Sequence, residues 1–186
     1  MPRINVIQPE EATGALKEIF DQLLKERGQI AEVHKIQSLR PESIVKHMDL
    51  YMEIMFSKSK LSRSQREMIA VIVSRANGCT YCVKHHGSAL NFYWKDIEKL
   101  NQLIEDYKNT DLTENDIALC EYAEQLTRYP GQSKEQDFTE NLKRHGFSDE
   151  AVLDATLVIS YFNFVNRIVL SLDVGLESDE GKNNKY

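Results

Sequence analysis

Apolar residues recur at helical spacing along almost the whole chain. Within residues 10–27 the apolar side chains stand three and four positions apart, at Leu16, Ile19, Phe20, Leu23 and Leu24. Such spacing places them on one face of a helix. The same pattern predicts further helices over 41–55, 62–76, from about 79, 97–104, 113–126, 133–146 and after 148. No stretch alternates apolar and polar residues between hairpin turns. The sequence therefore predicts an all-α fold.

Capping residues mark several of the expected helix starts. A serine or threonine stands three residues before a polar partner at Ser62 with Gln65, Thr113 with Asp116 and Ser133 with Gln136. Asn77-Gly78 interrupts the pattern, so a new helix is expected to begin near Cys79. The stretch 152–172 is apolar nearly all round, and we expect it to be the central, buried helix.

The length and composition favour one globular domain. The chain has 186 residues, of which 41% are hydrophobic and 28% charged, so an intrinsically disordered or low-complexity chain is excluded. We expect a single helical domain over 1–177 and a disordered polar tail over 178–186. The net charge of −6 offers no basic face for nucleic acid.

Membrane and export signals are not expected. No apolar run approaches the roughly 18 residues that a membrane-spanning helix needs. The N-terminal sequence MPRINVIQPEEATG lacks the basic and then apolar pattern of a signal peptide. We therefore expect a cytoplasmic protein with no membrane partner.

Two of the three cysteines lie close together. On a helix Cys79 and Cys82 are three positions apart and His86 is four positions further, so all three side chains share one face. A free thiol titrates near pH ~8.5, and a helix N-terminus, a nearby imidazolium and a second cysteine each lower that value. The spacing thus favours a thiolate at neutral pH. A sulfenic acid formed on one thiol could condense with the other to a disulfide.

The residues around this pair resemble a known family. The spacing of four residues is similar to the signature of the alkylhydroperoxidase D-like group within the carboxymuconolactone decarboxylase superfamily. Eleven residues separate Glu67 from the Cys79-x-x-Cys82 motif, and three residues separate that motif from His86. The segment LSRSQREMIAVIVSRANGCTYCVKHHG resembles its peroxidase-related branch. The resemblance continues through PEEATG near the N-terminus, SLRPE at 38–42 and YFNFVNR at 161–167.

The resemblance implies a multi-helix bundle that carries the two cysteines at the N-terminus of a core helix. It further implies that Cys82 attacks a peroxide, that Cys79 resolves the intermediate, and that His86 and Glu67 relay protons. The resemblance also implies a thiol or dithiol compound as the reductant, and a homo-oligomer that is built from dimers and can be a trimer or hexamer. No cofactor and no metal ligand are expected. Tyr81 stands where the well-studied type has a histidine, and a phenol cannot shuttle protons at pH 7.

Other interpretations stay open at this point. The thiol pair could serve a protein disulfide reductase or electron carrier, a non-catalytic redox sensor, or a metal site, although zinc usually needs four ligands. Glu67 could be a solvated helix residue, and its contact with the cysteines does not follow from spacing.

Several other residues have both a structural and a functional interpretation. Polar residues within the apolar stretch, Asn163, Asn166 and Arg167, could bond other helices or subunits, or support the thiols. The run 92–94 could line an apolar pocket or pack in the core. His85 is expected at the surface and Cys120 in the core.

Overall fold

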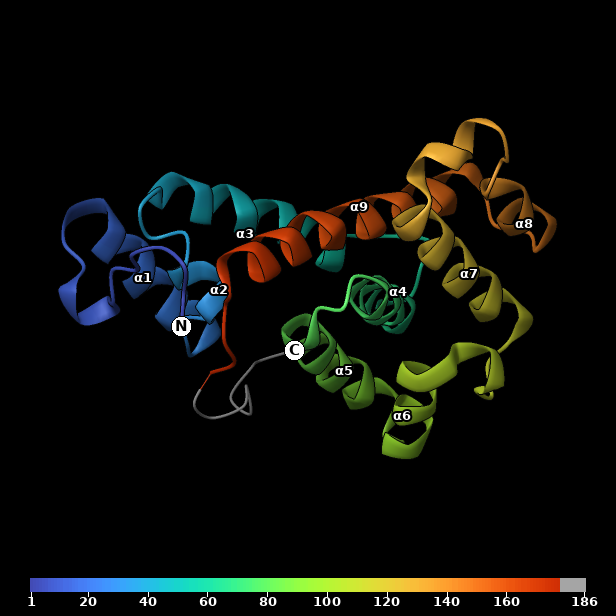
Figure 1. Ribbon diagram of the computed structural model, residues 1–186, viewed down its shortest axis with the longest axis horizontal. Coiled ribbons are helices and arrows are strands. Elements are labelled where there is room, and N and C mark those ends of the chain that lie inside the picture. Colours follow the sequence, from blue (N-terminus) through green and yellow to red (C-terminus); the bar gives the residue numbers. More distant parts are fainter. Residues whose placement is uncertain (178–186) are drawn as a thin grey trace. The chain divides into compact units, whose positions relative to one another are not determined.

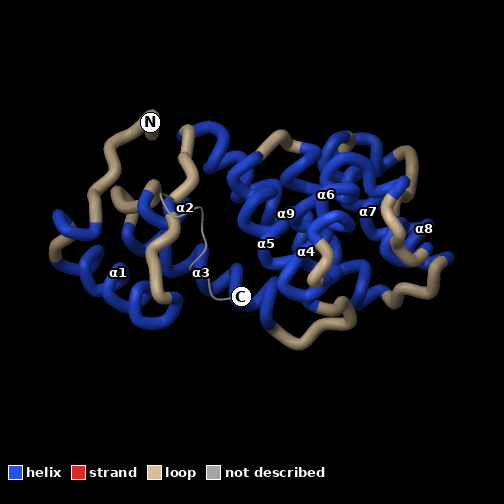
Figure 2. The backbone as a smooth tube through the Cα atoms, turned by 90° about the horizontal axis from the view of Figure 1, so that it is seen from below, coloured by secondary structure: helices blue, strands red, loops and turns tan. Residues whose placement is uncertain are grey.

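The computed structural model describes residues 1–177, and every regular element within them is a helix (Figures 1 and 2). The α-helices are α1 (Gly14–Arg27), α2 (Glu32–Lys35), α3 (Pro41–Phe56), α4 (Arg63–Ala76), α5 (Thr80–Trp94), α6 (Ile97–Asp106), α7 (Glu114–Arg128), α8 (Thr139–Arg144) and α9 (Asp149–Leu172). Short 3-10 turns cover Pro9–Glu11, Tyr107–Asn109 and Pro130–Lys134. The all-α prediction is confirmed. Residues 178–186, expected to form a polar tail, lie outside the described residues.

The chain folds into two compact units. Unit 1 comprises Met1–Glu53 and the chain from Arg167 onward, whereas unit 2 comprises Ile54–Asn166. The boundaries fall inside α3 and α9, so each of these helices contributes residues to both units.

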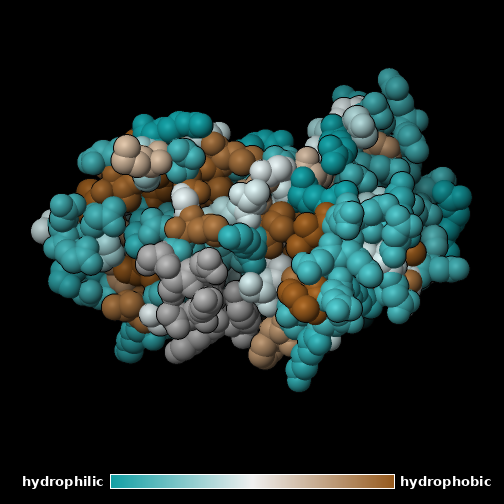
Figure 3. Space-filling view, turned by 60° about the horizontal axis from the view of Figure 1, so that its bottom comes forward, coloured by the Kyte–Doolittle hydropathy of each residue, from teal (hydrophilic) through white to brown (hydrophobic). Residues whose placement is uncertain are grey.

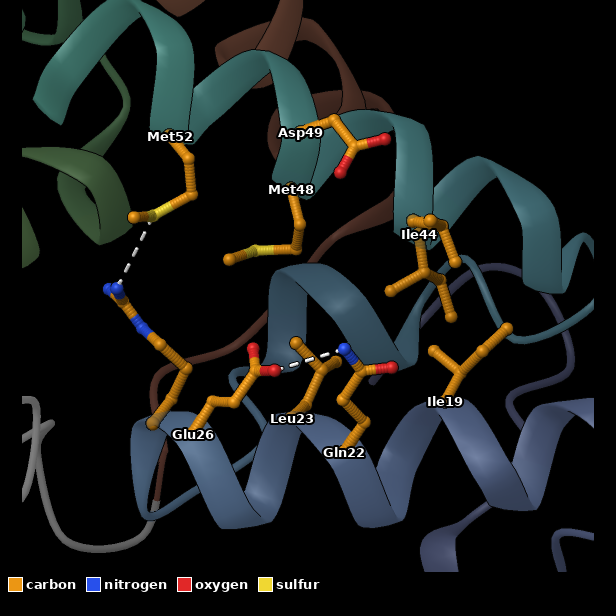
Figure 4. A pocket seen from close by; sticks show the side chains of 10 residues that line it. Ile19, Gln22, Leu23, Glu26, Ile44, Met48, Asp49 and Met52 are labelled. Atoms are coloured by element: carbon orange, nitrogen blue, oxygen red, sulfur yellow. Dashed lines mark hydrogen bonds between the residues drawn. The ribbon is translucent and has the colours of Figure 1, made fainter. Parts of the chain in front are cut away.

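Unit 1 has a small core between α1 and α3. Its buried side chains are Ala12, Leu16, Phe20, Leu23 and Ile44. Beside this core lies a cavity of about 260 Å³, into which side chains of α1 and α3 project from opposite sides (Figure 4). The apolar stripe predicted for α1 packs here through Leu16, Ile19, Phe20 and Leu23, whereas Leu24, also predicted to lie on it, is 52% exposed.

Unit 2 is built around α4, in which nine consecutive residues from Arg66 to Ser74 are buried. This helix packs most extensively against α5 and α7. The expectation that the stretch 152–172 would be a helix buried all round is confirmed for one of its faces only. In α9 Leu153 is 57% exposed and Phe164 is 49% exposed, so one face of that helix reaches the surface. Apolar side chains come to the surface in several places (Figure 3).

Helix α9 also corrects the expectation that no stretch could cross a membrane. Its length and apolar composition meet that criterion, which the core helix of a soluble protein meets as well. The fully buried Asn166 within α9 bonds to other side chains of unit 2. This bonding is typical of a core helix, in which a buried amide needs protein partners.

Capping explains where α4 and α7 begin. The Ser62 hydroxyl accepts from the Gln65 amide at 3.1 Å, and the Gln65 side chain accepts from the Ser62 amide at 3.0 Å. Thr113 caps α7 in the same manner through the Asp116 amide. The start predicted at Ser133 is wrong because that residue lies in a 3-10 turn. Helix α8 begins at Thr139, whose amide donates to the Asp137 carboxylate.

Candidate functional site

The two cysteines of the pair meet at the N-terminus of α5. Cys79 is the N-cap residue of that helix, and Cys82 stands in its first turn. Gly78, directly before the pair, has a φ of +72°, in the left-handed region where glycine is least strained. This turn brings α5 back against α4. The two sulfur atoms lie 2.8 Å apart, within hydrogen-bonding distance, and both residues are buried.

The two thiols differ in acidity. A hydrogen bond from the Cys82 thiol lowers the pKa of Cys79, and the backbone amide of Cys82 acts in the same direction against the effect of burial. Donating that hydrogen bond raises the pKa of Cys82, and burial together with the neighbouring Cys79 charge raises it further. When one proton leaves the pair, the negative charge therefore rests mainly on Cys79. This residue lies at the N-terminus of α5, where the helix dipole favours an anion.

Glu67 and His86 face each other across the contact between α4 and α5. The imidazole Nδ1 of His86 lies 2.7 Å from a carboxylate oxygen of Glu67. The Glu67 side chain is completely buried, whereas that of His86 is 16% exposed. On α5, His86 stands one turn beyond Cys82, about 6 Å along the helix axis. The structure thus pairs Glu67 with His86 and Cys79 with Cys82, and both pairs lie where α4 packs along α5.

Arg63 keeps the buried Glu67 carboxylate charged. Its guanidinium donates twice to one oxygen of Glu67, at 2.9 and 2.5 Å. Burial by itself would raise the pKa of Glu67, but His86 and Arg63 outweigh this and hold the pKa below its ordinary value. A third bond from Arg63 to the Met55 carbonyl fixes the guanidinium over the Phe56 ring. Arg63 was missed in the sequence, although its position four residues before Glu67 suits an ion pair on one helix face.

Side-chain amides connect α9 with the end of α4, directly before the thiol pair. The Asn77 side chain, at the end of α4, donates to the side-chain oxygens of Asn163 at 3.1 Å and Asn166 at 3.0 Å. Asn166 donates to the Ser74 hydroxyl at 3.2 Å. The expected bonding between helices is therefore present for both asparagines.

Several other residues singled out in the sequence lie elsewhere on α5 and on α7. Tyr81 stacks on His85, with 4.4 Å between the ring centroids. Phe92 and Tyr93 are 59% and 40% exposed, and they stand ten or more residues beyond Cys82, about 15 Å along α5. Cys120 is buried in α7, as expected, and burial raises its pKa.

A metal centre has no support in the part of the chain that the structure describes. Within residues 1–177, no three His, Cys, Asp or Glu side chains are arranged to hold an ion. The site instead offers two thiols that can exchange protons with each other, and a charged carboxylate that orients an imidazole. These groups are suited to thiolate chemistry with proton transfer.

The comparison with protein families matches the part of the chain that holds this site. Residues 44–92 match the family described as the carboxymuconolactone decarboxylase family. The matched segment contains Glu67, Cys79, Cys82 and His86. The resemblance drawn from the sequence is therefore confirmed.

Solved structures share the complete fold. The AhpD-core structure of an uncharacterized peroxidase-related protein from Ralstonia eutropha JMP134 has a TM-score of 0.85 at 22% identity, covering 99% of this chain and 98% of that one. An uncharacterized peroxidase-related protein from Silicibacter sp. TM1040 has a TM-score of 0.83 at 26% identity, covering 98% of each chain. The debrominase Bmp8 has a TM-score of 0.78 at 21% identity, covering 97% of this chain and 95% of that one. The predicted AhpD-like helical fold is confirmed, and a debrominase shares it.

Proposed function

We propose that this protein, whose residues 44–92 match the carboxymuconolactone decarboxylase family, is an oxidoreductase that reduces hydroperoxides through Cys79 and Cys82. The observation that carries the proposal is the 2.8 Å contact between two buried thiols at a helix N-terminus. The pair can ionise there, and its two sulfurs need to move little to form a disulfide, in which they stand about 2.05 Å apart. The AhpD-core and peroxidase-related neighbours support an antioxidant role of this kind.

The first step is attack of a thiolate on the peroxide. The sulfur of Cys82 forms a bond to one peroxide oxygen, the O–O bond breaks, and the alkoxide leaves and takes up a proton to become an alcohol. The sulfur is oxidised to a sulfenic acid, and the peroxide is reduced by the same two electrons. Cys82 has the attacking role in the resembled family. In this chain it acquires the negative charge when its proton passes to Cys79.

The second step closes the disulfide. The Cys79 thiolate attacks the Cys82 sulfur, the S–S bond forms, and the S–OH bond breaks to release hydroxide, which is protonated to water. A dithiol reductant then returns two electrons and two protons to the pair by exchange. His86, held by the Glu67 carboxylate and partly exposed, is the group that supplies and collects these protons.

Burial of the pair favours a small substrate over a protein disulfide. Cys79 is fully buried and Cys82 is 2% exposed. A peroxide needs to bring only its oxygen atoms to the sulfur, whereas a disulfide on a partner protein must align two further sulfurs with it. We therefore rank the disulfide reductase and the redox sensor below the peroxidase.

The test is steady-state reduction of cumene hydroperoxide with dithiothreitol as the electron donor. Turnover is expected in the wild type and in Cys120→Ser, whose cysteine is buried elsewhere, and it is expected to collapse in Cys79→Ser and Cys82→Ser. Equal turnover in all four proteins would overturn the proposal. If the wild type has no turnover but its Cys79–Cys82 disulfide is rapidly reduced, the function is disulfide exchange instead.

A further inference from the structure

The carboxylate of Glu67 serves a different partner with each of its two oxygens. Oε1 accepts two hydrogen bonds from the Arg63 guanidinium, at 2.9 and 2.5 Å. Oε2 lies 2.7 Å from Nδ1 of His86. A carboxylate that is completely buried needs a positive partner, and both of these side chains can carry that charge.

Arg63 is held in its position by contacts that do not involve His86. Its guanidinium also donates to the Met55 carbonyl at 3.1 Å and lies 3.6 Å from the centre of the Phe56 ring. The side chain is only 12% exposed. A guanidinium is not deprotonated in proteins, whereas an imidazole gains and loses a proton near neutral pH. The positive charge that Arg63 brings to Glu67 is therefore permanent.

We propose that Arg63 is a positioning residue that supplies the permanent counter-charge of Glu67 and so leaves His86 free to lose and regain a proton. With Arg63 in place, the buried carboxylate is balanced while His86 is neutral. Without Arg63, the carboxylate would retain a proton on His86 as its counter-ion. The inference rests on the proposed function, in which His86 gives a proton to the leaving alkoxide and later takes one up.

A second buried arginine of α4 lies near Glu67 but serves the backbone. The Arg66 guanidinium donates to the carbonyls of Ile54 and Ser57, at 3.1 Å each. These bonds hold the end of α3 and the turn that follows it. Arg63 is thus the arginine whose hydrogen bonds reach the carboxylate that faces His86.

The elements around α5 bring mostly neutral groups to His86. From α9, the ring of Phe162 meets the imidazole edge-on, with 4.4 Å between the ring centroids. From α6, leucine and isoleucine side chains approach α5 at Gly87. On α5 itself, Cys82 stands one turn before His86, and His85 stacks on a neighbouring tyrosine. The charge of His86 therefore responds mainly to Glu67 with Arg63 and to the thiol pair.

The experiment follows the imidazole resonance of His86 against pH by NMR. It uses the Cys79→Ser/Cys82→Ser protein, so that no thiol of the pair titrates, and the resonance is assigned by its absence in His86→Gln. A charge within a few ångströms shifts a titration by about 1 to 3 pH units, and Arg63 acts from the far side of the carboxylate. Because the charge removed is positive, Arg63→Gln is expected to move the midpoint upward by about one pH unit. Arg63→Lys, which retains the charge, is expected to return it most of the way.

Arg75→Gln is the matched control. Arg75 lies on the same helix, 12 residues beyond Arg63 and about 18 Å along the axis. It also lies near a carboxylate, that of Glu124, and donates to a backbone carbonyl, that of Glu105. Its removal changes the net charge equally without touching Glu67, so the midpoint of His86 is expected to stay in place. An unmoved midpoint in Arg63→Gln, or an equal movement in Arg75→Gln, would overturn the inference.

A measurement without a substitution at Arg63 guards against a variant that does not fold. At about pH 8 in the same double-serine protein, nitrogen-15 spectra are expected to show a neutral His86 with its hydrogen on Nδ1, donated to Glu67. A His86 with hydrogens on both nitrogens, or on Nε2 alone, would contradict the inference.

Peroxide turnover separates this inference from the proposed function. In the protein with both cysteines, Arg63→Gln is expected to lower turnover at pH 7 about tenfold, in line with a shift of one pH unit, and Arg63→Lys to restore most of it. Unchanged turnover in Arg63→Gln would overturn the inference. A wild type without turnover, in which His86 still responds to Arg63 as described, would refute the proposed function alone.

Discussion

The buried ion pair between Arg63 and Glu67 gives a prediction whose size follows from the structure. Glu67→Gln removes the carboxylate that accepts two hydrogen bonds from Arg63 and faces His86. The Glu67 side chain is fully buried and that of Arg63 is 12% exposed, so the guanidinium would keep its charge in a site with little water. Removing one partner of a buried pair costs about 3 to 5 kcal/mol. Because glutamine retains one oxygen for Arg63, we expect the free energy of unfolding to fall by about 3 kcal/mol.

The matched control is an ion pair with the same spacing on the surface. Lys17 and Asp21 are also four residues apart in a helix, but their side chains are 58% and 63% exposed. Asp21→Asn is therefore expected to cost less than about 1 kcal/mol. Both variants are compared with the wild type by urea unfolding, followed by far-UV circular dichroism.

The pH dependence of this effect has a defined sign. The pKa of Glu67 is lower in the folded protein than its ordinary value of 4.5, so the carboxylate stabilises the fold above that pH. The contribution is lost as the pH falls through the folded-state pKa. The difference between wild type and Glu67→Gln should therefore persist from pH 7 to about 4.5 and shrink below it. Equal losses in Glu67→Gln and Asp21→Asn at pH 7 would refute the reasoning.

Three further predictions concern the framework of the two units. Burial lowers the pKa of His47 from 6.5 to about 4, so the unfolded chain takes up a proton before the folded one does, and stability falls by about 3 kcal/mol as the pH drops from 6.5 to 4. His47→Asn should reduce this dependence of the free energy of unfolding on pH, as measured by urea unfolding. An unchanged dependence would contradict the prediction. Ser62→Ala removes the cap of α4 and should cost about 1 kcal/mol, whereas Ser133→Ala, in a turn, should cost less. Gly78→Ala places a side chain at a φ of +72° and should lower stability by about 1 kcal/mol, while Gly131→Ala should not; equal effects would argue against strain at this turn.

Local signals in the sequence predicted the elements of this fold well. The spacing of apolar residues and the caps at Ser62 and Thr113 correspond to α4 and α7, because both depend on contacts within a few residues. Ser133 with Gln136 has the same local pattern but lies in a turn after Pro130. The exposed face of α9 could not be predicted either, since composition does not tell which side of an apolar helix is covered.

The site was predictable to the extent that it lies on one helix. Cys79, Cys82 and His86 share a face of α5, and their spacing alone places them there. The contact of Glu67 with His86 depends on how the turn at Gly78 directs α5 along α4, which spacing does not fix. The bond from Asn166 to Ser74 joins residues 92 positions apart in the sequence. Only the packing of α9 against the α4–α5 turn reveals it.

The most direct test of the thiol chemistry is a single-turnover reaction. The fully reduced protein is mixed with one equivalent of cumene hydroperoxide, and its mass, its disulfides and the alcohol product are measured together. The account predicts that one alcohol forms per chain, that the protein loses two hydrogen atoms, and that peptide mapping finds a bond between Cys79 and Cys82. Alcohol formation without that disulfide, or a protein left fully reduced beside unreacted peroxide, would contradict it.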